Sequence, residues 1–365
     1  MPGTIANTVD VRIRPAVGFP TDYARRVDSS DLTDLVEVAR AGDEAAFDRL
    51  VARYRGELTA HCYRMLGSLP DAEDAVQESL LSAWRGLAGF EGRSSLRTWL
   101  YRITTNACLR LNRKRPHRIL SSEYGPSRGD TTDLGDFVTE PVFLEPWPDN
   151  LPADEPDPAA SVLRREGVEL AFISALQHLP ATQRAVLILR DVLEYPAAEV
   201  AQILDTSPAS VNSALQRARK TVQDKVPAVT QQHELAMLGA DRQRALIDAF
   251  VAAWERADVD AIVALLAEDV RFTMPPLPAW FDGREDVARF FIERVFKTPW
   301  RLVPIRANAQ PGFACYQRNP DDHRFRLGAI NVLSLRSGQI TEISAFLDPE
   351  VHRRFGLPYE FPAQR

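Results

Sequence analysis

The chain has 365 residues, a length that accommodates two or three domains of ordinary size. Its composition, 45% hydrophobic and 26% charged, is typical of a soluble globular protein and excludes a disordered or fibrous one. No apolar run approaches the roughly 18 residues that a membrane span needs, and no apolar segment near the N-terminus has the form of a secretory signal. Three distant cysteines, Cys62, Cys108 and Cys315, form no C-x-x-C pair and are expected to be reduced core thiols of a cytoplasmic protein.

The net charge of −6 does not suggest nucleic-acid binding, but the distribution of charge along the chain does. Between Ser95 and Arg118 there are seven Lys or Arg and no acidic residue. Between Ser121 and Ala160 there are ten Asp or Glu and one basic residue, Arg128. This separation predicts one surface that binds phosphate and one segment that avoids or imitates it.

Hydrophobic periodicity divides the chain into parts of different structure. Helical periodicity runs from about residue 31 to 116, stops in a stretch rich in Pro and Asp, and returns from about 159 to 226. Another helix is expected near 241–257, followed by strand-like alternation at 270–274 and 324–335 and a hairpin into 339–346. The predicted segments are a flexible tail (1–30), a first helical domain (31–116), an acidic Pro-rich linker (117–160), a second helical domain (161–229), a connector (230–240) and an α+β C-terminal domain (241–365).

Two consecutive helices of the first helical domain each have an apolar stripe and a charged face. In the first, Asp71, Asp74 and Glu78 share the face opposite a stripe that ends at Leu87. This acidic face is either an ordinary solvated surface or a binding surface. In the second, Arg102, Asn106 and Arg113 project along one flank, with Arg97 nearby. A basic helix beside aromatic and hydroxyl side chains suits single-stranded or melting DNA, in which bases stack and phosphates need neutralising.

Residues 196–220 have the pattern of a helix–turn–helix. Asp205 to Ser207 form the predicted turn, with Ser207 as the cap of the next helix and Pro208 at its first position. In that helix an apolar stripe points inward: Val211, Ala214, Leu215 and Ala218. The residues predicted to face outward or to flank that row are Asn212, Ser213, Gln216, Arg217 and Lys220. Such a row can contact base edges in a major groove, and the alternative is a helical hairpin with an ordinary polar face.

These segments resemble those of a known family. Leu66 to Glu78 resembles region 2.2 of bacterial sigma factors, residues 83–85 and 90–103 resemble regions 2.3 and 2.4, and residues 196–220 resemble region 4.2. Together they resemble an RNA polymerase sigma factor of the extracytoplasmic-function group of the sigma-70 family. The resemblance implies two all-α sigma domains, a region 2 helical bundle and a region 4 helix–turn–helix.

The same resemblance implies a role for each charged face. Four residues would bind the clamp of core RNA polymerase: Asp71, Asp74, Gln77 and Glu78. Four would contact the −10 strand: Arg97, Arg102, Asn106 and Arg113, beside a loop from Glu91 to Ser95 that captures a flipped base. Five would read the −35 element: Asn212, Ser213, Gln216, Arg217 and Lys220. The family usually has Gly at the position of Asp205 and Lys or Arg at that of Asn212, so the −35 sequence stays open.

The linker has two interpretations. Its ten acidic residues and seven prolines predict an extended, anionic segment that is too polar to bury a core. In sigma factors the equivalent segment threads the active-site cleft, and the alternative is a simple tether. Residues 143–149 are unusually apolar for a tether and are expected to contact the C-terminal domain.

The C-terminal domain resembles SnoaL-like domains, a cone-shaped α+β fold of the type fused to sigma factors in actinobacteria. The resemblance rests on residues 249–254, 265–270 and 283–285 and on the closing hairpin. Five aromatic or apolar residues either line a pocket or form ordinary core: Trp254, Phe272, Met274, Trp280 and Tyr316. Candidates for a general base are Asp269, Asp348 and His352, but no spacing among them demands chemistry, so no catalytic residue is assigned.

The sequence therefore predicts a non-enzymatic, cytoplasmic sigma factor whose C-terminal domain regulates it in cis. Its expected partners are core RNA polymerase, through the clamp and flap, and promoter DNA, with a small ligand of the C-terminal domain left open. Neither a membrane, a cofactor, a metal nor a separate anti-sigma factor is required by the sequence. The alternative is a SnoaL-like enzyme or ligand sensor joined to a DNA-binding regulator.

Overall fold

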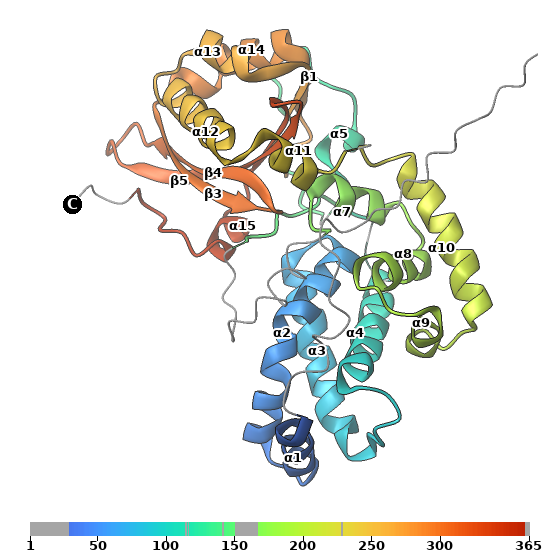
Figure 1. Cartoon of the computed structure of the whole chain (residues 1–365). Helices are drawn as coiled ribbons and strands as arrows, with labels where there is room; N and C mark the ends of the chain where they lie inside the picture. The colour runs from blue at the N-terminus through green and yellow to red at the C-terminus, as the bar shows by residue number, and fades with distance from the viewer. Residues whose placement is uncertain are drawn as a thin grey trace, which may run out of the picture.

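The computed structural model of the chain describes residues 29–113, 115, 117–140, 142–149, 167–227 and 229–361. It joins a helical body to a domain in which helices cover a sheet (Figure 1). The tail predicted at 1–30 lies outside the described residues except for its last two positions, as does the part of the linker after residue 149.

The first helical domain has four principal helices: α1 (Ser29–Arg40), α2 (Glu44–Leu66), α3 (Leu69–Gly86) and α4 (Leu96–Asn112). The turn between α2 and α3 takes two residues. Gly67 has a φ of 69°, which suits glycine, and its N–H bonds to the carbonyl of Tyr63 at the end of α2. Ser68 then begins α3 by accepting a hydrogen bond from the N–H of Asp71.

The second helical domain contains the predicted helix–turn–helix. Its helices are α7 (Leu170–Gln177), α8 (Ala181–Leu187), α9 (Ala197–Ile203) and α10 (Pro208–Gln223), and a π-helical turn over Ile188–Val192 follows α8. Ser207 caps α10 and Pro208 is its first residue, as predicted. Asp205 has a φ of 52°, so it supplies the left-handed turn conformation for which glycine is usual. The four predicted inward residues of α10 are all buried.

The two helical domains share one hydrophobic core. Helix α4 packs against α8 and α9, and α2 packs against α7. Arg184 of α8 is buried at the junction, where its guanidinium donates to the carbonyls of Met65, at the end of α2, and of Gln177 and Leu179. Burial lowers the pKa of Arg184 to about 10. Because these carbonyls come from both domains, the buried cation holds the domains together.

The described part of the linker, residues 117–140 and 142–149, is docked on the helices instead of extended, so the prediction that it is too polar to bury a core is wrong there. A short helix, α5 (Ser121–Tyr124), forms near its start. Phe143, Leu144 and Trp147 are buried, and the last two belong to the core that the helical domains share. These apolar side chains give the acidic segment enough buried surface to dock on the helices.

The C-terminal domain is built on a six-stranded sheet of order β2-β1-β6-β5-β4-β3, in which β1 and β6 are parallel and the other pairs antiparallel. Its strands are β1 (Leu266–Thr273), β2 (Trp280–Asp282), β3 (Trp300–Ala307), β4 (Gln310–Arg318), β5 (Phe325–Arg336) and β6 (Gln339–Phe346). Three helices lie over one face (Figure 1): α12 (Ala240–Glu255), α13 (Val259–Leu265) and α14 (Gly283–Glu293). Side chains of α15 (Pro349–Arg354) and of residues 355–361 pack on the other face.

Strand alternation in the sequence identified β1, β5 and β6, and the α+β class is correct. The turn of the predicted hairpin lies at Ser337 and Gly338, which join β5 to β6 with φ values of 52° and 78°. The segment 230–240 is more than a connector, because it contains helix α11 (Gln231–Leu238), which packs against β5. Strands β2, β3 and β4 were not predicted.

Within the described ranges, every helix is too short or too polar to cross a membrane. Cys62, Cys108 and Cys315 are free and buried, as expected of core thiols.

His61 of α2 predicts a dependence of stability on pH. Its ring is fully buried with Nε2 2.9 Å from Oγ1 of Thr105, and burial, helped by the charges of Arg64 and Arg97, lowers its pKa to about 3. In the unfolded chain this histidine takes up a proton near pH 6.5, whereas in the folded chain it stays neutral to a much lower pH. The free energy of unfolding is therefore highest above pH 6.5 and decreases as the pH falls below that value. Because of this group, the free energy of unfolding measured in urea should be about 2 kcal/mol lower at pH 5 than at pH 7.

The matched variant is His61→Gln, which keeps a hydrogen-bonding side chain and cannot titrate. It should lose most of the difference between pH 7 and pH 5. An unchanged difference in His61→Gln would show that other groups cause the pH dependence.

Candidate nucleic-acid and polymerase interfaces

The acidic face of α3 is exposed in part. Asp74, Gln77 and Glu78 are exposed, and Glu78 pairs with Arg110 of α4 at 2.7 Å. Asp71 does not belong to this surface, because only 4% of it is exposed. Asp71 therefore does not share an exposed face with Asp74 and Glu78, contrary to the prediction, and its role in polymerase binding stays a prediction.

Asp71 instead holds the linker. The guanidinium of Arg118 donates to the Asp71 carboxylate at 2.8 Å, to the carboxylate of Glu145 at 3.0 Å and to the carbonyl of Phe143 at 2.9 Å. Glu145 also accepts a hydrogen bond from Ser68, the cap of α3, at 3.1 Å. Burial lowers the pKa of Arg118, opposed by Glu145, so the cation depends on its carboxylate partners. This ionic network fixes the linker to the first turn of α3.

The residues predicted to form the basic flank of α4 also differ in exposure. Arg102 and Arg113 are exposed, Asn106 is half-buried, and the loop from Glu91 to Ser95 is largely exposed. Their arrangement leaves a surface that a nucleic-acid strand can reach. Arg97, in contrast, lies between the first and second helical domains.

The surroundings of Arg97 occupy its guanidinium in this arrangement, and its contact with the −10 strand stays a prediction. Its guanidinium bonds to both carboxylate oxygens of Glu57, at 2.7 to 3.1 Å, and to the hydroxyl of Tyr195 at 3.0 Å. It also lies over the rings of Tyr101 and Tyr195. Burial raises the pKa of both tyrosines, so their hydroxyls stay neutral. The neighbouring Thr98 donates to Glu199 of α9 at 3.3 Å.

The outer face of α10 is open. All five residues predicted to point outward are exposed: Asn212, Ser213, Gln216, Arg217 and Lys220. The adjacent Arg219 forms an ion pair with Asp191 at 2.7 Å, which braces α10 against the π-helical turn after α8. The helix–turn–helix thus presents amide, hydroxyl and cationic groups in one row, as major-groove recognition requires.

The residues proposed to line a pocket are core residues. Trp254, Phe272 and Met274 are buried between the helices and the sheet. Tyr316 is buried on the opposite face, because neighbouring residues of β4 alternate between faces. Trp280 points to the linker, where its Nε1 donates to the carbonyl of Gly125 at 2.8 Å. The five side chains therefore do not surround a common cavity.

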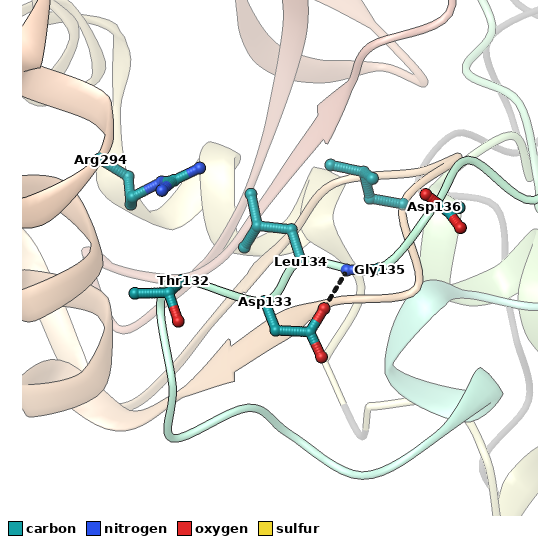
Figure 2. Close-up of a pocket in the computed structure, with 7 residues that line it drawn as sticks. Thr132, Asp133, Leu134, Gly135, Asp136 and Arg294 are labelled. Carbon is teal, nitrogen blue, oxygen red and sulfur yellow. Dashed lines mark hydrogen bonds between the residues drawn. The ribbon is translucent and has the colours of Figure 1, made fainter.

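A cavity of about 410 Å³ lies elsewhere, between the linker and the C-terminal domain. Figure 2 shows Arg294 on one side of it and Leu134 and Asp136 of the linker on another. Its other lining residues are Thr132, Asp133, Gly135 and Leu277. Leu134 also packs against the core of the C-terminal domain, so the linker forms part of the wall.

The three candidates for a general base have structural roles. Asp269 is exposed, and a hydrogen bond from Arg336 lowers its pKa, which makes it a weaker base. Asp348 caps α15 by accepting from the N–H of Glu350 at 2.8 Å. Burial lowers the pKa of His352, whose Nε2 lies 2.8 Å from a backbone carbonyl. None of the three lines the cavity of Figure 2.

A residue that sequence reasoning missed joins the three parts of the chain. Asn308 and Ala309 form the tip of the β3–β4 hairpin with φ values of 55° and 57°. The Asn308 side chain donates to the hydroxyl of Tyr63 at 2.8 Å and to the carbonyl of Val168 at 2.6 Å, and it accepts from the N–H of Trp147 at 2.8 Å. These partners belong to α2, to the start of the second helical domain and to the linker. The only sequence signal for this residue was that Asn is common at the turns of β-hairpins.

Two further contacts tie the C-terminal domain to the helical body. Arg354 of α15 forms an ion pair with Glu73, near the start of α3. Glu169, next to α7, accepts from the N–H groups of Gln231 and Gln232 at the start of α11, at 2.9 and 3.0 Å. The C-terminal domain thus contacts both helical domains.

Comparison with known proteins agrees with this three-part division. The family model for Sigma-70 region 2 matches residues 50–117, that for Sigma-70, region 4 matches residues 169–222, and that for the SnoaL-like domain matches residues 247–343. The crystal structure of the Mycobacterium tuberculosis extracytoplasmic function sigma factor SigJ has the same fold, with a TM-score of 0.55 and 23% sequence identity over 83% of this chain and 97% of that one.

Similar sequences lead to the same family. The ECF RNA polymerase sigma factor SigW of Bacillus subtilis is 27% identical over 52% of this chain and 94% of its own length. The ECF RNA polymerase sigma factor SigG of Mycobacterium tuberculosis is 42% identical over 364 residues, which cover 95% of this chain and 96% of that protein. The chain therefore belongs to the family of ECF RNA polymerase sigma factors and has a SnoaL-like domain at its C-terminal end.

Proposed function

We propose that the chain binds core RNA polymerase, directs it to promoters by reading a −10 and a −35 element, and is regulated in cis by its SnoaL-like domain. Sigma factors bind core polymerase and promoter DNA, which supports a cytoplasmic location for this protein. The proposal is supported by the exposed faces of α3, α4 and α10 in a single chain. Asp74, Gln77 and Glu78 would bind the polymerase clamp, with the second helical domain on the flap.

The observation that carries the cis regulation is the contact made by Asn308. One side chain of the C-terminal domain holds Tyr63, Trp147 and the backbone at Val168 together. Elements about 25 base pairs apart are separated by about 85 Å of duplex, at about 3.4 Å per base pair. Two domains that share one core cannot span that distance, so promoter reading requires them to separate. By stabilising their contact, the C-terminal domain would oppose initiation.

A regulatory rather than enzymatic C-terminal domain is supported by the structural roles of Asp269, Asp348 and His352. The aromatic residues that could line a catalytic pocket pack as core instead. No cluster of three or more His, Cys, Asp or Glu suited to a metal ion occurs among the residues that the structure describes.

The polymerase contact predicts the effect of charge reversal on α3. Asp74→Lys with Glu78→Lys should weaken binding to core polymerase at least about tenfold, because both side chains are exposed and opposite charge would be lost at the interface. A fluorescence titration with core polymerase measures this. Asp241→Lys with Asp248→Lys, a reversal of equal size on α12, should leave the affinity unchanged. Equal effects of the two pairs would contradict a specific role for α3.

The hairpin tip predicts that loosening it raises promoter output. Asn308→Gly keeps the left-handed turn and removes three hydrogen bonds. The closed arrangement, in which the C-terminal domain holds the two helical domains together, should therefore be destabilised by about 1–3 kcal/mol. Run-off transcription at limiting sigma factor should then rise about 5–150-fold. His323→Gly is the control, since His323 is exposed and also has a positive φ of 61°. A decrease with the fold intact would mean that the tip supports the holoenzyme instead.

A further inference from the structure

The acidic face proposed to bind polymerase is only partly open in the closed arrangement. Asp74 and Glu78 of α3 are exposed, whereas Asp71, one helical turn before Asp74, is buried. Near the same end of the helix, Glu73 pairs with Arg354 of α15. The linker and the C-terminal domain thus cover the start of α3 and leave the rest of its acidic face exposed.

The linker reaches Asp71 through two cations that follow α4. Arg118 donates to the Asp71 carboxylate at 2.8 Å, and Arg115 forms a second ion pair with it. Only 5% of Arg118 is exposed, and it also donates to Glu145 and to the carbonyl of Phe143. A buried carboxylate that loses its cationic partner is strongly destabilised, so Asp71 needs a cation in any arrangement in which it stays covered.

We infer that the linker and core RNA polymerase compete for Asp71, and that the polymerase must displace Arg118 to complete its contact with α3. The inference rests on the proposed binding of α3 to polymerase and adds the step that releases the linker. A polymerase surface seated on Asp74 and Glu78 lies within one helical turn of Asp71, because these positions are spaced i, i+3 and i+7. Only a surface that supplies its own Arg or Lys can replace Arg118 without leaving the carboxylate buried and unpaired.

Competition at Asp71 couples polymerase binding to the opening of the chain. Arg118 holds the linker at Glu145, and two residues further on the N–H of Trp147 donates to Asn308 at the tip of the β3–β4 hairpin. Displacing Arg118 therefore loosens the segment that lies between α3 and the C-terminal domain. By linkage, freeing the linker strengthens polymerase binding, and polymerase binding weakens the hold on the linker by the same factor.

The test is a fluorescence titration of the full chain with core polymerase. Arg118→Gln removes the charge that occupies Asp71, so it should tighten binding at least about fivefold, the lower end of typical couplings between sites. Arg118→Lys keeps the charge with fewer hydrogen-bond donors and should give a smaller gain, and it serves as the second variant if Arg118→Gln does not fold. Arg128→Gln is the matched control, because Arg128 lies in the same linker but pairs with Asp133 of that linker, at 3.6 Å. It should leave the affinity unchanged.

A double-mutant cycle tests whether the effect of Arg118 acts through Asp71. In a chain that carries Asp71→Asn, the further change Arg118→Gln should lose most of its effect on polymerase binding. The reason is that the acidic group for which the linker and the polymerase compete has already been removed.

Three outcomes would overturn the inference. One is unchanged or weaker polymerase binding by folded Arg118→Gln, which would show that the linker contact does not oppose the polymerase. A second is an equal gain in Arg128→Gln, which would reduce the effect to the overall charge of the linker. A third is an undiminished gain in the Asp71→Asn chain. Asp74→Lys with Glu78→Lys separates these failures from failure of the proposed function, because this pair would still weaken binding in each of them and would have no effect if α3 does not bind polymerase.

Discussion

Asn308 occupies a left-handed position at the tip of the β3–β4 hairpin and points its carboxamide at three backbone or hydroxyl groups from different parts of the chain. Asn308 is fully buried, so its three hydrogen bonds form away from water and stabilise the contact between these parts of the chain. Around this contact the linker is held by the network of Asp71, Arg118 and Glu145, and the two helical domains by Arg184. The arrangement of the whole chain therefore depends on polar groups buried between its parts.

Local patterns in the sequence were enough to predict much of the fold. The cap at Ser207, the turn at Asp205 and the inward residues of α10 depend on neighbours within one or two helical turns, and all are confirmed. The same holds for strands β1, β5 and β6 and for the turn at Ser337. The outward residues of α3 and α10 are exposed as predicted, except Asp71, although their binding roles stay predictions.

The errors concern contacts between segments that are distant in the sequence. Asp71 has the spacing of a surface residue, and only the position of Arg118, 47 residues later, shows that it is buried. The contacts of Arg97 with Glu57 and Tyr195 were not predicted, because these partners lie 40 and 98 residues away in the sequence. Strand β3 was missed because Pro304 interrupts its pattern, which an edge strand tolerates. The role of Asn308 could not be predicted, because no local pattern shows what a hairpin tip touches.

The distance between the two helical domains tests this account most directly. Nitroxide labels at Asp48→Cys on α2 and Gln223→Cys on α10 would report it by pulsed electron resonance, since both sites are exposed and the three native cysteines are buried. The account predicts one narrow distance distribution in the free chain and a shift to distances longer by tens of ångströms in the complex with core polymerase and promoter DNA, as elements about 85 Å apart require. An unchanged distribution on forming that complex would contradict it.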